Sequence, residues 1–145
     1  MGYRSTVAYT IRFETPSYDK PEEKEDPEDA KRSFYTFLAE AKANVDTSLC
    51  FTDTDCFEVD EEKLQIRFFA EEIKWYESYP DVACHEALIE LSKSWADDDT
   101  SNPYIGGAFA RVGEDTNDNV EEVWGQGEYG WVGVNRSVYA DWYVT

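Results

Sequence analysis

Hydrophobic and polar residues alternate along residues 3–14, YRSTVAYTIRFE, near the start of the chain. A period of two places successive side chains on opposite faces of a strand. One face is apolar and consists of Val7, Tyr9, Ile11 and Phe13. The other face consists of Ala8, Thr10, Arg12 and Glu14. The segment is therefore predicted to be an amphipathic strand.

Apolar residues recur at steps of three and four in two later segments, which is the period of a helix. The first helix is predicted over about 27–44, with Asp26 as its N-cap and Pro27 at its first position. The second is predicted over about 80–97, with an apolar stripe of Cys84, Ala87, Leu88, Leu91 and Trp95. Three acidic residues and then Pro103 follow it, and acids oppose the negative end of the helix dipole.

The segments between and after the helices have strand and turn patterns. Residues 56–60 and 63–76 are predicted to form an antiparallel hairpin around the acidic turn Asp60-Glu61-Glu62. The last third of the chain contains further strands, in which Gly106 and Gly107 indicate a bulge or a close approach of another backbone.

The order of these elements, β-α-β-β-α-β-β, predicts an α+β fold with two helices packed on one face of an antiparallel sheet. The chain has 145 residues and no internal repeat, so a single domain over residues 1–145 is expected. Prolines and acidic residues dominate residues 15–26, which are therefore expected to form a solvated acidic linker.

The formal net charge of −19, from 32 acidic and 13 basic residues, narrows the range of partners. Affinity for nucleic acids depends on cations that displace counterions, so direct nucleic-acid binding is not expected. Binding to anionic membranes is disfavoured for the same reason. The charge favours a basic protein partner, or serves solubility alone. No signal peptide or membrane-spanning run is seen, so a soluble cytoplasmic protein is expected.

Cysteine and histidine residues give no sign of a metal centre or an enzyme. Cys50, Cys56 and Cys84 are odd in number and lack CxxC spacing, so reduced, mostly packed thiols are expected. The single histidine, His85, is expected on the surface near a helix start. Cys84 is its neighbour, but adjacent helix residues diverge by about 100° and do not face each other. No catalytic or cofactor motif is present, so we expect no enzymatic activity and no cofactor.

Acidic residues form several clusters that are candidates for partner binding. The largest lies in RVGEDTNDNVEE, residues 111–122, which is predicted to be an acidic loop, and consists of Glu114, Asp115, Asp118, Glu121 and Glu122. The others are Asp97, Asp98 and Asp99 at the end of the second helix and Asp60, Glu61 and Glu62 in the hairpin turn. To imitate a nucleic-acid backbone such clusters must align on one surface. The alternative is that they are scattered, solvated loops.

Trp75 and Tyr76, at the junction between a strand and the second helix, are candidate interface anchors. The alternative for both residues is packing in the core, because aromatic residues make up 16% of the chain.

The same acidic segment was compared with the calcium-binding loop of an EF-hand. Asp115, Asn117 and Asn119 match the alternating oxygen ligands. Val120 stands where the loop needs glycine, and Gln126 stands where it needs a bidentate glutamate. A weak calcium-binding module is therefore an alternative, and no dedicated metal site is predicted.

Three segments carry a resemblance to known proteins: MGYRSTVAYTI, IKWYESYPDV and ARVGEDTNDNVEE followed by VGVNRSV. In this order they resemble a group of small, acidic tailed-bacteriophage proteins of unknown function. The resemblance implies a phage origin, and small acidic phage proteins are often similar to those that disable host defences, including anti-restriction and anti-CRISPR proteins.

The resemblance and the charge together lead us to expect a non-enzymatic inhibitor in the host cytoplasm. Its acidic surface would block the basic nucleic-acid-binding site of a host defence complex. The alternative is a phage accessory or structural protein that binds another phage protein. The oligomeric state is left open.

Overall fold

The computed structural model describes residues 4–13, 27–53, 55–76, 78–97, 105–115, 118–128, 130–134 and 138–142. Its elements are β1 (Ser5–Phe13), α1 (Pro27–Ala43), the 3₁₀-helix η2 (Ser48–Thr52), β2 (Phe57–Asp60), β3 (Gln65–Ile73), α2 (Pro80–Asp97), β4 (Ile105–Val112), β5 (Asn119–Gly125), β6 (Val132–Val134) and β7 (Val138–Ala140). The predicted α+β class and both predicted helices are confirmed. The expected linker at 15–26, the expected cap Asp26, and Asp98 and Asp99 lie outside the described residues.

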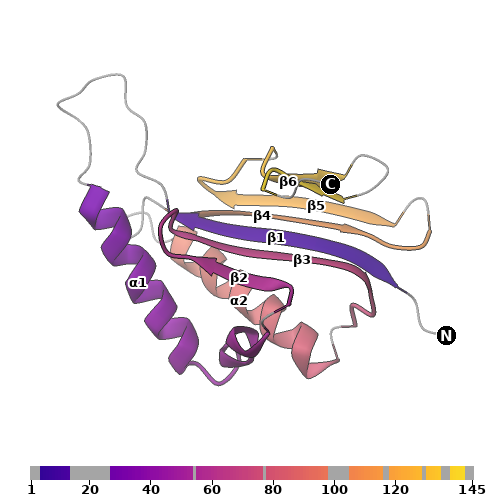
Figure 1. The fold of residues 1–145 in the computed structure, drawn as a ribbon, viewed down its shortest axis with the longest axis horizontal. Coiled ribbons are helices and arrows are strands. Elements are labelled where there is room, and N and C mark those ends of the chain that lie inside the picture. The colour runs from indigo at the N-terminus through magenta and orange to yellow at the C-terminus, as the bar shows by residue number, and fades with distance from the viewer. Residues whose placement is uncertain are drawn as a thin grey trace.

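Five strands form one antiparallel sheet in the order β2-β3-β1-β4-β5, shown in Figure 1. The amphipathic first strand lies at its centre, between β3 and β4. The predicted hairpin turn is confirmed, and Asp60 Oδ1 accepts the backbone N–H groups of Glu62 and Lys63. This side chain closes the turn in the way that aspartate favours.

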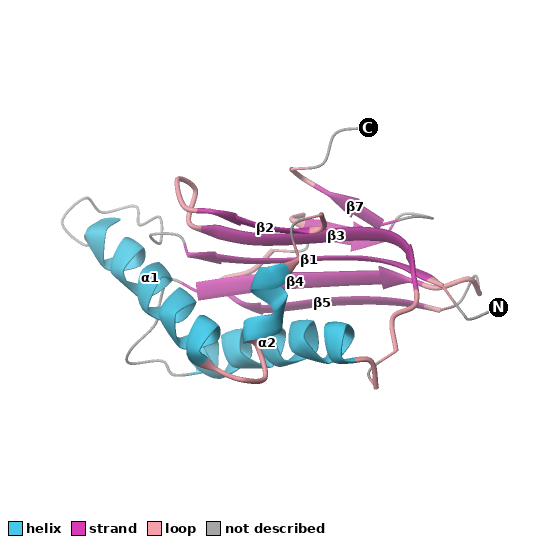
Figure 2. Cartoon of the chain, turned by 60° about the horizontal axis from the view of Figure 1, so that its bottom comes forward, coloured by secondary structure: helices cyan, strands magenta, loops and turns pink. Residues whose placement is uncertain are grey.

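The two helices lie on the same face of the sheet, as predicted and as Figure 2 shows. The apolar face of β1 packs beneath them, because Val7, Tyr9, Ile11 and Phe13 all belong to the main core. The Phe13 ring lies 5.6 Å from that of Phe37 in α1 and 6.3 Å from that of Trp95 in α2, measured between ring centroids. Neither described helix combines the length and the apolar composition that crossing a bilayer requires.

The opposite face of the sheet is covered by a second, two-stranded sheet formed by β6 and β7. The polar face of β1 is therefore buried, and Arg12 is 5% exposed. Its guanidinium carbon lies 4.4 Å from the centroid of Trp131, and its Nη2 lies 2.5 Å from Asp141 Oδ1. The sequence pattern suggested an amphipathic strand with one polar face, but both faces of β1 are covered.

The predicted close approach of another backbone is confirmed at Gly106, whereas Gly107 lies against a side chain. A Cβ atom on Gly106 would lie 2.4 Å from the backbone nitrogen of Gly127, and one on Gly107 would lie 2.2 Å from the Trp124 ring. The chain beyond β5 therefore packs directly on the start of β4.

Candidate functional site

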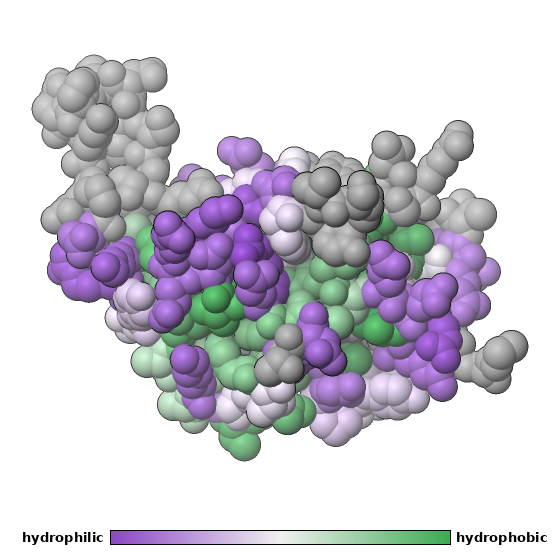
Figure 3. All heavy atoms as spheres, viewed as in Figure 1, coloured by the Kyte–Doolittle hydropathy of each residue, from purple (hydrophilic) through white to green (hydrophobic). Residues whose placement is uncertain are grey.

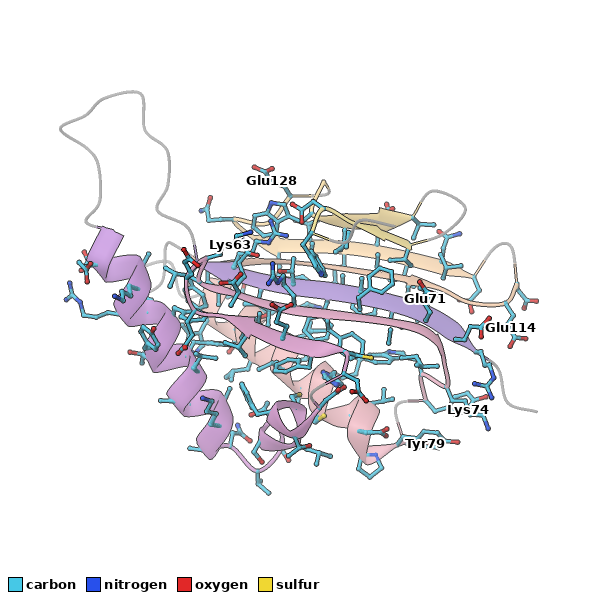
Figure 4. All side chains as sticks on the ribbon, in the orientation of Figure 1. Lys63, Glu71, Lys74, Tyr79, Glu114 and Glu128 are labelled. Atoms are coloured by element: carbon cyan, nitrogen blue, oxygen red, sulfur yellow. The ribbon has the colours of Figure 1, made fainter. Side chains whose placement is uncertain are left out.

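The acidic clusters predicted from the sequence lie at two ends of the sheet. Phe13 at the end of β1 is opposite Ile105, and Arg12 is opposite Gln65, so the Asp60-Glu61-Glu62 turn is at this end. Asp97 ends α2 near the same edge, because Trp95 packs on Phe13. The β4–β5 loop lies at the other end, where Thr6 is opposite Val112. Lys63 and Glu114 mark the two ends in Figure 4.

The predicted acidic loop is partly strand, because Glu121 and Glu122 belong to β5 and point to opposite faces of the sheet. Glu122 faces the helices, and its Oε1 lies 2.5 Å from Lys93 Nζ of α2. Glu121 faces the other way and accepts the backbone N–H of Val134 in β6. This division follows from strand geometry, in which successive side chains alternate.

Internal partners engage other acidic groups of this segment. Both carboxylate oxygens of Asp118 accept hydrogen bonds from Arg111, at 3.1 and 2.9 Å. Asp118 is not among the predicted calcium ligands, and Asn117, which is one of them, lies outside the described residues. The weak calcium site therefore stays a prediction.

Trp75 and Tyr76 lie together on a groove between α2 and the β4–β5 hairpin. The groove has a volume of about 440 Å³, and its charged lining residues are Glu86, Lys93, Arg111, Asp118 and Glu122. Trp75 Nε1 donates a hydrogen bond to Glu86 Oε1 at 3.0 Å. The two predicted anchors thus line the same groove as two of the predicted acidic residues, Asp118 and Glu122.

Beside this groove, the end of the sheet carries four exposed carboxylates, which we name the sheet-end cluster: Glu71, Glu72, Glu114 and Asp115. Arg4 ties its two strands together, because its N–H donates to Glu114 Oε1 at 2.8 Å and its Nη1 donates to the Glu72 carbonyl at 2.9 Å. Figure 4 shows Glu71 and Glu114 toward the same end. Sequence reasoning missed Glu71 and Glu72, although two successive acids do break the alternation of the strand.

A cluster of cysteine and histidine side chains lies on the helix side of the sheet, between η2 and α2. The Sγ atoms of Cys50 and Cys84 and a ring nitrogen of His85 all lie within 4.8 Å of one another. All three residues are buried. Among the described residues, no other group of three or more histidine, cysteine or acidic side chains converges in this way.

His85 is 3% exposed, so the expectation of a surface histidine is wrong. It lies one helical turn from the buried residues Val82 and Leu88, on the face of α2 that packs on the sheet. Its ring centroid is 4.4 Å from that of Phe68, and its Nδ1 is 2.6 Å from the Tyr9 hydroxyl. Burial lowers the pKa of His85 to about 4, so its imidazole is neutral at pH 7.

The cysteines are free thiols, as expected, with Cys50 and Cys84 buried. Burial raises the pKa of both thiols, and the Cys84 Sγ donates a hydrogen bond to the Asp81 carbonyl at 3.3 Å. A backbone N–H of His85 acts in the opposite direction on the pKa of Cys84. Both thiols are therefore protonated at neutral pH when no metal ion is bound.

A cavity of about 480 Å³ opens next to this constellation, and Asp53, Cys56, Cys84 and His85 are among its lining residues. The negative charges of Asp53 and Asp81 act on His85 and favour a positive charge there. The site thus combines two sulfur donors, one nitrogen donor and a field that attracts cations.

No protein-family model, no curated protein and no solved structure matches this chain. The phage origin proposed for the protein therefore rests on the resemblance of three of its segments, and the proposed binding surfaces rest on the contacts of the structure.

Proposed function

We propose that the protein is a phage-encoded, non-enzymatic inhibitor that binds a basic nucleic-acid-handling protein of a host defence system. The proposal is carried by one observation. The sheet-end cluster has four exposed carboxylates. It adjoins the groove lined by Trp75 and Tyr76, because Asp118 of the groove lining donates its backbone N–H to the Asp115 carbonyl. Carboxylates attract lysine and arginine side chains, and aromatic residues commonly anchor protein interfaces.

The pairing of three arginines supports this proposal, although Arg4 and Lys74 lie at the same end as the cluster. Three arginines of the sheet form ion pairs with carboxylates of the same chain. The pairs are Arg12–Asp141, Arg67–Asp60 and Arg111–Asp118. These cations are thus held close to the body of the protein. The net charge of −19 acts on an approaching basic protein and increases the rate of encounter at low salt.

The net negative charge attracts a basic partner, and the shape and lining of the groove select among such partners. Its acidic lining residues are partly balanced by Lys93 and Arg111. A partner side chain that enters must therefore fit the Trp75 and Tyr76 surface as well as the charge. We expect a lysine or arginine with a long apolar stem at this position, because such a side chain contacts both kinds of lining.

The test is affinity capture of host proteins from nuclease-treated lysate on the tagged protein, with elution in steps of rising salt. The informative variant carries Glu114→Lys and Asp115→Lys in the sheet-end cluster. The matched control carries Glu61→Lys and Glu62→Lys at the opposite end of the sheet, which alters the net charge equally. Circular dichroism verifies that both variants fold.

We expect a nucleic-acid-handling complex that elutes at moderate salt and competes with DNA or RNA. The sheet-end variant should weaken capture at least tenfold more than the control. Equal losses in both variants would mean that net charge alone drives binding, which contradicts the assigned surface. Capture of phage proteins that resist high salt would instead support the accessory-protein alternative, in which aromatic burial holds the partner.

A further inference from the structure

We propose that Cys50, Cys84 and His85 form a binding site for one thiophilic divalent metal ion, with zinc as the best match. This inference is independent of the acidic surface. It rests on the convergence of two sulfur atoms and one imidazole nitrogen within 4.8 Å. Cysteine and histidine are the ligands that zinc prefers in proteins.

The distances suit a site that closes around an ion with little movement. Zinc–sulfur bonds of about 2.3 Å in a tetrahedron place two sulfur ligands about 3.8 Å apart. The present separations are at most 4.8 Å, so contraction by about 1 Å completes the geometry. The donors come from η2 and the first turns of α2, which pack against each other, so small shifts of side chains suffice.

The donor set also matches the charge of the ion. Two thiolates and a neutral imidazole give an uncharged complex with a divalent cation, which lowers the cost of burying it. Binding forms two metal–sulfur bonds and one metal–nitrogen bond, and the two thiol protons leave to solvent. Three protein ligands leave a fourth position, and the adjoining cavity lined by Asp53 and Cys56 provides room for water there.

The Tyr9 hydroxyl contacts the His85 ring and can fix its orientation in the site. This hydroxyl lies 2.6 Å from Nδ1, and this is the only hydrogen bond to the His85 ring within the described part of the chain. When Nδ1–H donates to the Tyr9 oxygen, Nε2 is the ring nitrogen that we propose for the ion. Histidine ligands commonly donate their other ring N–H in this way, which fixes the tautomer and the ring orientation.

The test uses the reduced, metal-free full chain and cobalt as a spectroscopic probe of zinc. We expect a thiolate-to-cobalt charge-transfer band that saturates at one equivalent and disappears when zinc is added. Zinc should also release protons into weak buffer and raise the thermal midpoint, because an ion that binds the folded state stabilises it. Cys50→Ser and Cys84→Ser should each lose the charge-transfer band.

Cys56→Ser is the matched control, since Cys56 lines the same cavity but lies outside the three-residue group. It should bind cobalt with unchanged stoichiometry. Tyr9→Phe keeps all three donors and removes only the hydroxyl, so it should keep the band and weaken zinc binding about 10–100-fold. This variant provides a test even if a serine variant does not fold.

Three results would overturn the proposal. The first is the absence of a charge-transfer band in the folded, reduced protein with titratable thiols. The second is a band that persists in both Cys50→Ser and Cys84→Ser. The third is its loss in Cys56→Ser to the same extent as in Cys84→Ser, which would place the ion on a different cysteine.

Discussion

Arg12 is a charged residue of the central strand that the β6–β7 sheet covers. It extends from the central strand into the space beneath the β6–β7 hairpin, where it is 5% exposed. A buried charge is tolerated only when it is paired and hydrogen-bonded. Trp131 stacks on the guanidinium and Asp141 accepts two of its hydrogen bonds, so the hairpin supplies both requirements.

Asp141→Asn should therefore lower the free energy of unfolding by about 1–3 kcal/mol, the usual range when a hydrogen bond to a charged group is lost. Urea denaturation at pH 7 measures this change. Glu90→Gln is the control, because the Lys93–Glu90 pair is exposed at its acidic partner and worth less than about 0.5 kcal/mol. Equal effects of the two substitutions would show that Asp141 does not hold Arg12.

His85 shows why single residues of a site escape sequence reasoning. Its burial could have been inferred from Val82 and Leu88, which lie three residues before and after it on the same helix face, but its partners could not. Tyr9 is distant along the chain, and only the packing of α2 on the sheet brings its hydroxyl to the imidazole. Cys50 likewise reaches Cys84 because η2 packs on α2, so no short cysteine spacing marks the pair.

At the scale of elements, the junction of β4 with the chain after β5 depends on the absence of side chains. Gly106 lies against the Gln126–Gly127 backbone, which cannot move aside without breaking strand pairing. Gly106→Ala should lower the free energy of unfolding by about 1–3 kcal/mol, as overpacking does.

Gly130→Ala is the matched control, because a Cβ atom there meets nothing within 4 Å. It should be neutral or stabilise by up to about 1 kcal/mol through the unfolded chain. Thermal unfolding of the two variants side by side measures the difference. A neutral Gly106→Ala would mean that the two segments are not in contact.

Elements with strong periodicity could be predicted from the sequence, and short ones could not. The spacing of apolar residues indicated α1 and α2 nearly to their ends, and alternation indicated β1. The strands β6 and β7 each have three residues, which is too short for a period to be seen. Strands were predicted in the last third of the chain, but a separate two-stranded sheet over the second face of β1 was not, so the burial of Arg12 was missed.

At the scale of the molecule, the predicted acidic clusters that the structure describes lie at both ends of the sheet. Figure 3 shows one face, on which hydrophilic residues gather toward the two ends with more hydrophobic residues between them. Binding through one end, as proposed, leaves the charge at the other end to act only through its long-range field. Such a field affects the rate of encounter more than the lifetime of a complex.

The net negative charge also affects the stability of the fold. Two like charges 10 Å apart in water repel by about 0.4 kcal/mol, and a compact chain with a net charge of −19 holds many such pairs. Unfolding separates them, so repulsion lowers stability at low ionic strength. Raising sodium chloride shortens the screening length from about 30 Å at 0.01 M to about 3 Å at 1 M.

We therefore expect the free energy of unfolding to rise by on the order of 1 kcal/mol between low and high sodium chloride, or about 2–4 °C in the thermal midpoint. A variant with Glu61→Gln, Glu62→Gln, Glu114→Gln and Asp115→Asn should start higher and rise less, because fewer charges remain to be screened. Urea denaturation across the salt series measures both slopes. Parallel slopes would mean that the gain comes from a general salt effect, whereas a smaller slope in the variant assigns it to these carboxylates.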